Sequence, residues 1–349
     1  MRFGDVPASL DVLRGQRFDG VVAVGDAPAV LAAEAALMLE IPFHPPAAAR
    51  ACHDKNESRR LFQAAGLPVP QFYRAPLDEP PESAARQATY PCVLKPLSLS
   101  ASRGVIRAND PREFAAAFAR IKTMLPREQF LQVEAYIPGR EFAVEGLLTR
   151  GAPRILAIFD KPDPLEGPFF EETIYVTPSR ESAEVQREIR TAVERAVHAL
   201  GLCHGPFHAE LRYNDGGAWM LEVAARPIGG LCAKVLRPLE ELIIRHAIGE
   251  DVSPLDLAGG ASGVMMIPIP RAGVYRDVDG VAEARAVRDI DDVIITAKEG
   301  QMLLPLPEGA AYLGFIFARA AEPAEVEQAL RQAHARLKFE IAMALPTGR

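Results

Sequence analysis

The chain has 349 residues, of which 49% are hydrophobic, and its formal net charge is −7 at pH 7. This length suffices for a large core and for two or three subdomains. Acidic and basic residues are mixed along the sequence without a block of Lys and Arg, which argues against a nucleic-acid-binding surface.

The four cysteines lie far apart and form no CxxC pair. Reduced thiols in a cytoplasmic protein are the simplest interpretation, and the spacing gives no support to a zinc site. The first residues, MRFGDVPASLDVLRG, lack a basic segment followed by an apolar core, and acids interrupt the apolar zone at residues 18–43. We therefore predict neither a signal peptide nor a membrane span.

In chain order, residues 21–24 predict a buried strand and residues 27–40 a helix, the start of a β-α-β piece without a G-x-G-x-x-G fingerprint. A short helix follows in DKNESRRLFQAAGLPVP and stops at Gly66. CVLKP and GVIRA read as strands around a loop, and residues 110–125 as a helix capped by Asp110. QFLQVEAYI and REFAVEGLLT read as strands. Residues 182–201 and 239–251 read as helices.

From about residue 258 the pattern changes to short strands with Pro and Gly turns, and a late helix starts at Pro323. This mixture predicts α/β or α+β subdomains and excludes a helix bundle or an all-β sandwich.

Residues 207–230, FHAELRYNDGGAWMLEVAARPIGG, read as two alternating strands joined by a turn, with one acid on each strand, Glu210 and Glu222. A two-residue loop would place these acids on opposite faces. A three-residue loop, residues 215–217, would place Glu210 opposite Glu222 and on the same face as His208. We favour the three-residue loop because it needs a glycine in the left-handed region and this turn offers two.

Like charges that face each other on a sheet are unfavourable unless a cation lies between them. Carboxylate oxygens suit Mg²⁺, especially where substrate phosphates complete its coordination. The alternative is an exposed hairpin with two solvated acids. Against it stands an apolar opposite face, formed by Phe207, Ala209, Leu211, Trp219, Leu221 and Val223.

Arg226 follows the second acid, and backbone N–H groups near Gly229 and Gly230 are suited to receive an anion. Lys95 ends a predicted strand and precedes a loop of small residues that includes Ser102 and Gly104. Small residues let backbone N–H groups approach phosphate oxygens, although no Walker A motif is present. These features point to phosphate chemistry; the alternative for Lys95 is a solubilising lysine on an edge strand.

Together these segments resemble the ATP-grasp superfamily of carboxylate–amine ligases. The shared pattern comprises DKNESRRLFQAAGLPVP, CVLKPLSLSASRGV, FLQVEAYIPGREFAVEGLL and HAELRYNDGGAWMLEVAARPIGG, in the family's order. The C-terminal stretch from GVMMIPIPRAGVYRD to EPAEVEQALRQA is similar to that of L-amino acid ligases, a branch that includes dipeptide synthetases and carnosine synthase.

The resemblance implies an ATP-grasp fold of α+β and α/β character. A short α/β domain would occupy residues 1–53, the ATP-grasp domain residues 54–250 with lobes at 54–125 and 126–250, and an α+β cap region residues 251–349.

The resemblance also implies roles at matching positions. Lys55 and Lys95 would contact ATP phosphates, and Ser102 lies in the adjoining loop. Glu134, with the backbone from Ala135 to Ile137, would meet the adenine between two lobes. Glu141 would hold the ribose.

The remaining matches concern the metal and the reaction. Glu210 and Glu222 would bind Mg²⁺ or Mn²⁺, and Arg226 would steady an acyl phosphate. His208 would contact the substrate or accept the amine's proton; its alternative is a structural histidine beside the metal site. Taken alone, Glu134, Glu141 and Glu145 would be read as ordinary surface acids.

The implied reaction joins a small carboxylic acid, such as an amino acid, to an amine with release of ADP and phosphate. Neither a nucleic acid nor a membrane is expected as a partner, the expected location is the cytoplasm, and a homodimer is a common assembly in the superfamily. Residues 161–173 would cover the active site, where Lys161, Glu171 and Glu172 would contact substrate.

Two departures from the family pattern matter. Ala224 stands where many members have a third metal-binding residue, Asn, although the amino-acid ligase branch shares the EVAAR form. Only about fifty residues precede Lys55, which implies a trimmed N-terminal domain or a late start. The alternatives are a purine-type ATP-grasp ligase, a non-catalytic nucleotide-binding module and a phosphotransferase.

Overall fold

The computed structural model describes residues 3 and 5–343, and the chain forms two compact units. The first unit comprises Met1–Val69, Pro138–Asp160 and Ser179–Gly259, and the second comprises Pro70–Ile137, Lys161–Pro178 and Gly260–Arg349. Each unit has its own apolar core.

In the first unit, four strands pair in the order β6-β5-β8-β9. Their bounds are β5 Arg140–Thr149, β6 Ala152–Lys161, β8 Gly205–Asn214 and β9 Gly217–Ala224. The helices of this unit are α1 Val6–Leu13, α2 Asp26–Leu39, α3 Pro46–His53, α4 Lys55–Ala64, α7 Ala183–Ala199, the 3₁₀ helix η1 Cys232–Val235 and α8 Leu239–Ala247.

Local sequence sets the helix ends next to the site. Asp54 caps α4 by accepting the backbone N–H groups of Asn56 and Glu57 at 2.9 and 3.0 Å. Ser182 caps α7 by accepting the backbone N–H of Val185. The apolar faces of α3, α4 and α7 pack against β9, so one face of the sheet is buried and the other remains available for polar side chains.

The N-terminal segment differs from the prediction. The helix predicted at residues 27–40 is confirmed as α2, but residues 21–24 form no strand, and the described residues up to 53 contain helices only. Val22 and Val24 are 42% and 76% exposed. The predicted β-α-β piece is wrong because this extended stretch pairs with no neighbouring strand, and a strand is stable only within a sheet.

From the environment of His44 in this unit we predict a pH-dependent free energy of unfolding. Its Nε2 bonds the carbonyl of Pro206 at 2.9 Å and its Nδ1 accepts the N–H of Cys203 at 3.2 Å, an arrangement that fits the neutral ring. Burial, opposed in part by the Pro206 bond, lowers the pKa of His44 to about 4. The pKa of a histidine in the unfolded chain is about 6.5. Between pH 6.5 and pH 4 the unfolded chain therefore binds more protons than the folded chain.

The free energy of unfolding should therefore fall as the pH is lowered from 6.5 to 4. Urea unfolding at pH 7 and pH 5 measures this difference, and His44→Gln should reduce it without abolishing it, because burial also lowers the pKa of His246 to about 4. An equal pH dependence in wild type and variant would contradict the assignment.

The described residues of the second unit contribute strands to three sheets. The first has the order β1-β4-β2-β3, with β1 Phe72–Pro76, β2 Cys92–Pro96, β3 Ile106–Ala108 and β4 Phe130–Ala135. The second contains the run β12-β14-β10-β7, with β7 Ile174–Thr177, β10 Ala261–Ile267, β12 Ile290–Ile295 and β14 Gly314–Ala320. The third has the order β13-β11-β15, with β11 Gly273–Asp279, β13 Met302–Leu303 and β15 Lys338–Ala342.

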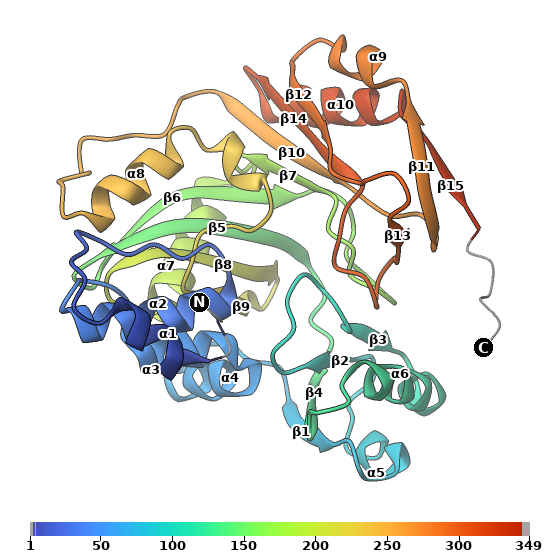
Figure 1. The fold of residues 1–349 in the computed structure, drawn as a ribbon. Coiled ribbons are helices and arrows are strands. Elements are labelled where there is room, and N and C mark those ends of the chain that lie inside the picture. Colours follow the sequence, from blue (N-terminus) through green and yellow to red (C-terminus); the bar gives the residue numbers. More distant parts are fainter. Residues whose placement is uncertain (1–2, 4, 344–349) are drawn as a thin grey trace. The chain divides into compact units, whose positions relative to one another are not determined.

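Four helices cover these sheets: α5 Pro81–Ala85, α6 Pro111–Met124, α9 Val281–Arg285 and α10 Pro323–His334. Asp110 caps α6, as predicted, and α6 packs on β2 and β3. Helix α10 packs on β10 and β14 (Figure 1). The C-terminal strands and the late helix of the prediction are thereby confirmed.

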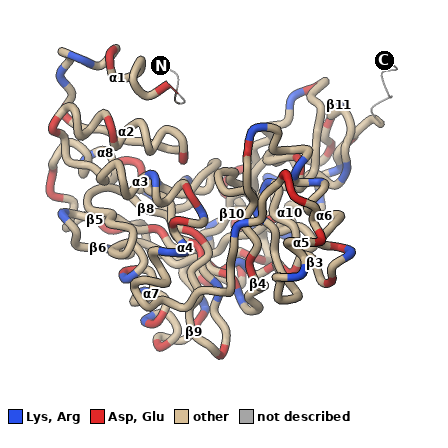
Figure 2. Tube along the Cα trace, turned by 90° about the horizontal axis from the view of Figure 1, so that it is seen from below, with Lys and Arg blue, Asp and Glu red and all other residues tan. Residues whose placement is uncertain are grey.

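Charges are distributed evenly over the trace. Figure 2 shows basic and acidic residues interspersed, and along the described chain no long stretch carries one sign alone. None of the helices in the described part combines the length and the apolar character that a membrane span needs. The described cysteines are free thiols; three are buried and Cys203 is half-buried.

Candidate active site

The two acids of the hairpin face each other on β8 and β9. The turn is a two-residue one, because Asn214 pairs with Gly217, so the predicted three-residue loop is wrong. A register shift between Glu210 and Leu211 nevertheless places Glu210 opposite Glu222, as predicted. The shift is a bulge that inserts one extra residue in β9 and restores the pairing that the shorter turn would have lost.

The bulge also changes which residues of β9 are buried. Ala218 and Met220 are 8% and 0% exposed, whereas Trp219 and Leu221 are only partly buried. The prediction that Trp219 and Leu221 belong to the buried face is therefore wrong, because the alternation reverses at the extra residue. Val223, beyond the bulge, and the predicted apolar residues of β8 are fully buried.

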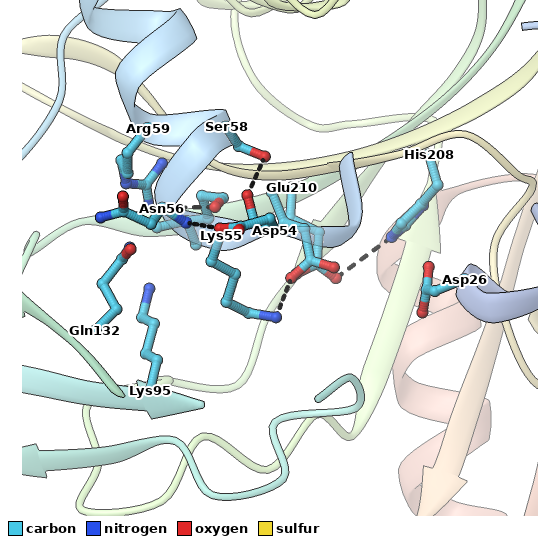
Figure 3. A network of polar contacts seen from close by, with 12 residues as sticks. Asp26, Asp54, Lys55, Asn56, Ser58, Arg59, Lys95, Gln132, His208 and Glu210 are labelled. Carbon is cyan, nitrogen blue, oxygen red and sulfur yellow. Dashed lines mark hydrogen bonds and ion pairs between the residues drawn. The ribbon is translucent and has the colours of Figure 1, made fainter. Parts of the chain in front are cut away.

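Lys55 provides a positive charge beside the acid pair. Its Nζ lies 3.6 Å from Oε2 of Glu222, and the side chains of Lys55, Glu210 and Glu222 are 15%, 22% and 28% exposed. Figure 3 shows Lys55 and Glu210 projecting into the same space next to the capped start of α4. Two partly buried, opposed carboxylates form a donor set that suits Mg²⁺, because this hard cation prefers oxygen ligands.

His208 sits next to Glu210 and is ion-paired on both ring nitrogens. Its Nδ1 contacts Oε1 of Glu145, and its Nε2 lies 3.3 Å from Oε1 of Glu210 (Figure 3). Burial alone would lower the pKa of this imidazole, but the charges and hydrogen bonds of Glu145 and Glu210 raise it to about 9. His208 therefore holds its proton at neutral pH in this arrangement and donates to both carboxylates.

Arg226 is fixed by an acid at the start of α2. Its Nε and Nη2 donate to the two carboxylate oxygens of Asp26 at 2.7 and 3.1 Å, and its Nη1 donates to the carbonyl of Pro227 at 3.0 Å. Asp26 is the first residue of α2, where the helix macrodipole favours a negative charge. This two-point contact fixes the plane of the guanidinium group.

Glu145 connects the hairpin to the segment after Arg226. One of its oxygens contacts His208, and the other accepts the backbone N–H of Ile228 at 3.1 Å. Glu145 is 1% exposed, so the interpretation of this residue as a surface acid is wrong. A fully buried carboxylate with two donors holds both segments at a fixed distance from β5.

Glu141 lies at the start of β5 and pairs with a neighbour on β8. Nε of Arg212 donates to its Oε2 at 2.9 Å, and the side chains of Arg212 and Glu141 are 3% and 9% exposed. Glu141 is thus largely buried, contrary to its interpretation as an ordinary surface acid. Its predicted ribose contact stays a prediction.

The second unit carries the other predicted nucleotide contacts. Lys95 and Gln132 are paired in register on β2 and β4, and Nζ of Lys95 donates to Oε2 of Glu134 at 2.6 Å. Nε2 of Gln132 donates to Oε1 of Glu134 at 2.5 Å, and Figure 3 draws Gln132 beside Lys95. Glu134 is 2% exposed, so it is no surface acid.

Gln132 also presents an orphan acceptor. Its Oε1 is buried without a hydrogen-bond partner, a state that is costly unless a bound group donates to it. At the end of β4 the N–H of Ala135 donates to the carbonyl of Gln71 at 2.9 Å, and Ile137, two residues further on, is buried. Ser102 lies in the loop after β2 with a left-handed backbone, φ 54°.

Comparison with known proteins identifies the family. A model described as ATP-grasp domain matches residues 88–235, and one described as L-amino acid ligase C-terminal domain 2 matches residues 265–342. The chain resembles the crystal structure of L-amino acid ligase from Bacillus licheniformis with a TM-score of 0.84 and 29% identity, over 97% of this chain and 86% of that one. The chain carries an ATP-grasp domain followed by an L-amino acid ligase C-terminal domain, the domains of an ATP-grasp ligase.

Two curated ligases match part of this ATP-grasp ligase. D-alanine–D-alanine ligase from Aromatoleum aromaticum is 29% identical over 59% of this chain and 64% of its own length. Alanine–anticapsin ligase from Bacillus subtilis is 30% identical over 52% of this chain and 43% of its own length. The chain thus spans less than two thirds of either ligase. Enzymes of this class form carbon–nitrogen bonds at the expense of ATP, as predicted.

The sequence did not reveal every polar residue of the ligase's site. Asp26, Gln132 and Arg59 were missed as site residues. The only local signal for Asp26 is a glycine directly before a helical pattern, which is too common to be informative. No pattern in the sequence relates Arg59 to the hairpin, because its partners are backbone carbonyls more than 150 residues away.

Arg59 supports the bulge of the ligase's hairpin. It is 2% exposed, and its Nη1 and Nη2 donate to the carbonyls of Met220 and Leu221 at 2.5 and 3.1 Å. Arg59→Met should lower the free energy of unfolding by about 3 kcal/mol, because it leaves carbonyls at the bulge without donors. The matched control is Arg60→Met, which alters the next residue, 66% exposed. Equal unfolding midpoints in denaturant for both variants would contradict the assigned role.

Proposed function

We propose that this ligase activates an amino acid or small carboxylic acid as an acyl phosphate and transfers the acyl group to an amine. The observation that carries the proposal is the opposed pair Glu210 and Glu222, with Lys55 beside it and a fixed guanidinium, Arg226, in the same unit. Opposed carboxylates, a lysine and an arginine are what phosphoryl transfer from ATP requires, since the reaction depends chiefly on positioning and neutralising charge.

The residues fit the metal that such a reaction needs. Glu210 and Glu222 would hold Mg²⁺, with Mn²⁺ as an alternative, and the metal when bound supplies charge neutralisation for the transferred phosphoryl group. Ala224 has no side-chain donor at the position where many ATP-grasp members have Asn.

We propose that Lys55 and Lys95 bind ATP phosphates and that the loop that contains Ser102 covers them. Glu134 and the backbone from Ala135 to Ile137 would bind the adenine, and Glu141 the ribose. Support comes from the polar side chains gathered at Lys95 and from the buried, orphan Oε1 of Gln132, which fits a ligand's N–H donor.

The proposed reaction has two steps. A carboxylate oxygen of the acid attacks the γ-phosphorus, the bond to the β-phosphate oxygen breaks, and ADP leaves. The amine nitrogen then attacks the acyl carbon, the carbon–oxygen bond to phosphate breaks, and inorganic phosphate leaves. Arg226 would stabilise the acyl phosphate through the N–H groups that Asp26 does not use.

His208 takes one of its two predicted roles in this scheme. The charges and hydrogen bonds of Glu145 and Glu210 raise the pKa of this imidazole while no metal is bound to Glu210. We propose that His208 contacts the substrate and orients Glu210.

Residues 161–173 are proposed to contact the substrate. Nζ of Lys161 bonds Oε1 of Glu172 at 2.5 Å and lies over the ring of Tyr175 at 4.8 Å. Burial raises the pKa of the neighbouring Glu171. Binding of a substrate's ammonium or carboxylate group nearby can change the protonation of Glu171 and the pairing of Glu172 with Lys161.

We further propose three finer features of this ligase. They are a homodimeric assembly, a cytoplasmic location and domains with the bounds 1–53, 54–250 and 251–349. The L-amino acid ligase C-terminal domain favours an amino-acid substrate over the purine-type alternative. Alanine is the first acid to test, because both curated ligases carry it in their names.

An isotope experiment tests the acyl phosphate. Alanine with ¹⁸O in its carboxylate is incubated with MgATP, an amine partner and the ligase. The proposal predicts one ¹⁸O atom in the released phosphate, because the attacking carboxylate oxygen leaves with it. Release of ADP with unlabelled phosphate would show that water, not the carboxylate, attacks the γ-phosphate and would contradict the proposal.

A further inference from the structure

The loop after β2 has a backbone that needs support. Ala101 and Ser102 both have φ 54°, in the left-handed region, and Gly104 has φ 72°. Non-glycine residues in that region are strained and persist only where surrounding contacts hold them. A Cβ at Gly104 would lie 2.6 Å from Cγ of Pro96, so no other residue fits there without a shift.

The support comes from a turn more than 200 residues further along the chain, within the same unit. The N–H of Gly104 donates to the carbonyl of Pro307 at 2.9 Å, and Nε of Arg103 donates to the carbonyl of Glu308 at 3.0 Å. Both bonds reach the end of the strained loop, directly beyond Ser102. The turn belongs to the region matched by the L-amino acid ligase C-terminal domain.

Arg120 on helix α6 holds the same turn through its side chain. Nε and Nη2 of Arg120 donate to Oε1 and Oε2 of Glu308 at 2.6 and 2.9 Å. The hydrogen bonds from Arg120 lower the pKa of the Glu308 carboxyl group. Glu308 is thus held twice, at its carbonyl by the loop and at its carboxylate by α6. A two-point arginine–carboxylate contact is the surface ion pair most able to fix geometry.

The turn is itself rigid. The N–H of Gly309 donates to the carbonyl of Pro305 at 2.9 Å, and a Cβ at Gly309 would lie 1.7 Å from the carbonyl oxygen of Leu304. Two prolines and a sterically required glycine restrict its conformations before any contact is made. A rigid turn can hold a strained loop at a lower entropic cost than a flexible one.

We propose that residues 305–309 form a clasp that holds residues 98–104 in the conformation that receives ATP phosphates, with Glu308 as a positioning residue. The proposal deepens the proposed function in one respect, that this loop binds phosphate. Its consequence is that the C-terminal domain contributes to nucleotide affinity as well as to any role with the amino acids.

Two readouts on the full chain test the clasp, one of which needs no activity. Hydrogen exchange at the peptide containing the Gly104 amide reports the hydrogen bond to Pro307, and titration with MgATP in the absence of amino acids reports affinity. Glu308→Ala should increase exchange in residues 98–104 and weaken MgATP binding by about fivefold. The swap Arg120→Glu with Glu308→Arg should recover part of both effects.

The matched control removes an acid from an exposed pair in the same domain. Asp292→Asn loosens the contact with Arg285, whose Nε lies 3.7 Å from Oδ1 of Asp292, and should change neither readout. Gly309→Ala tests the turn independently and should act like Glu308→Ala. Unchanged exchange of residues 98–104 in both variants would overturn the clasp. Raised exchange with unchanged MgATP affinity would overturn the positioning role. If the wild type binds no MgATP, the proposed function fails, whereas the exchange data still decide whether the clasp exists.

Discussion

Glu222→Gln is expected to abolish ADP release that depends on amino acids, by about a thousandfold or more, while the fold stays intact. Glutamine keeps the size and one oxygen of glutamate but removes the charge that would bind the metal opposite Glu210. Without bound metal the change has two opposing effects on stability. It removes the repulsion between the facing carboxylates, and it removes the ion pair with Lys55 at 3.6 Å.

The measurement combines turnover with thermal melting in the presence and absence of Mg²⁺ and ADP. The wild type should gain stability from the metal nucleotide and the variant should not. The matched control is Asp215→Asn, which removes an exposed acid from the turn of the same hairpin. Turnover within tenfold of the wild type in Glu222→Gln would show that Glu222 is no metal ligand.

Asp26→Asn should lower turnover by about a hundredfold and destabilise the chain by about 3 kcal/mol. The change leaves Arg226, whose side chain is 12% exposed, without its charged partner and frees its guanidinium plane to rotate. The loss should appear in the maximal rate more than in the KM for ATP, because Arg226 is assigned to the acyl phosphate. Asp26→Glu, which keeps the charge, should recover part of the rate.

The control for Asp26 lies on the same helix. Glu34→Gln breaks the ion pair between Glu34 on α2 and Arg50 and should leave turnover unchanged. The side chains of Glu34 and Arg50 are 26% and 56% exposed. A purely structural role of Asp26 would lower activity only in proportion to the unfolded fraction. Assays well below the melting temperature that show full turnover in Asp26→Asn would therefore contradict the positioning of Arg226.

The hairpin shows what the sequence allowed and where it stopped. The opposition of Glu210 and Glu222 was predicted correctly from two alternating strands and a glycine-containing turn. The turn itself was wrong, because a bulge at Leu221 has the same effect on register as one more loop residue. Residue spacing alone does not distinguish a bulge from a longer turn. In the structure the bulge is marked by the carbonyls of Met220 and Leu221, to which Arg59 donates.

The helices with clear caps were predicted well, because Asp54, Asp110 and Ser182 act on residues two or three positions away. The strand expected at residues 21–24 failed because strand formation depends on a distant partner that local sequence does not specify. The contacts of Asp26 with Arg226 and of Glu145 with Ile228 escaped prediction for the same reason, since each joins segments far apart in the chain.

The most direct test of the central claim is ADP release with MgATP across a matrix of amino-acid pairs, with mass spectrometry of the products. At least one pair, with alanine tested first, is expected to release ADP and to yield a product whose mass is the sum of both amino acids minus water. ADP release with only a phosphorylated acid, even when every amine in the matrix is supplied, would contradict ligation and indicate a phosphotransferase. Measurable ATP binding with no ADP from any pair would contradict catalysis on amino acids and favour a nucleotide-binding module.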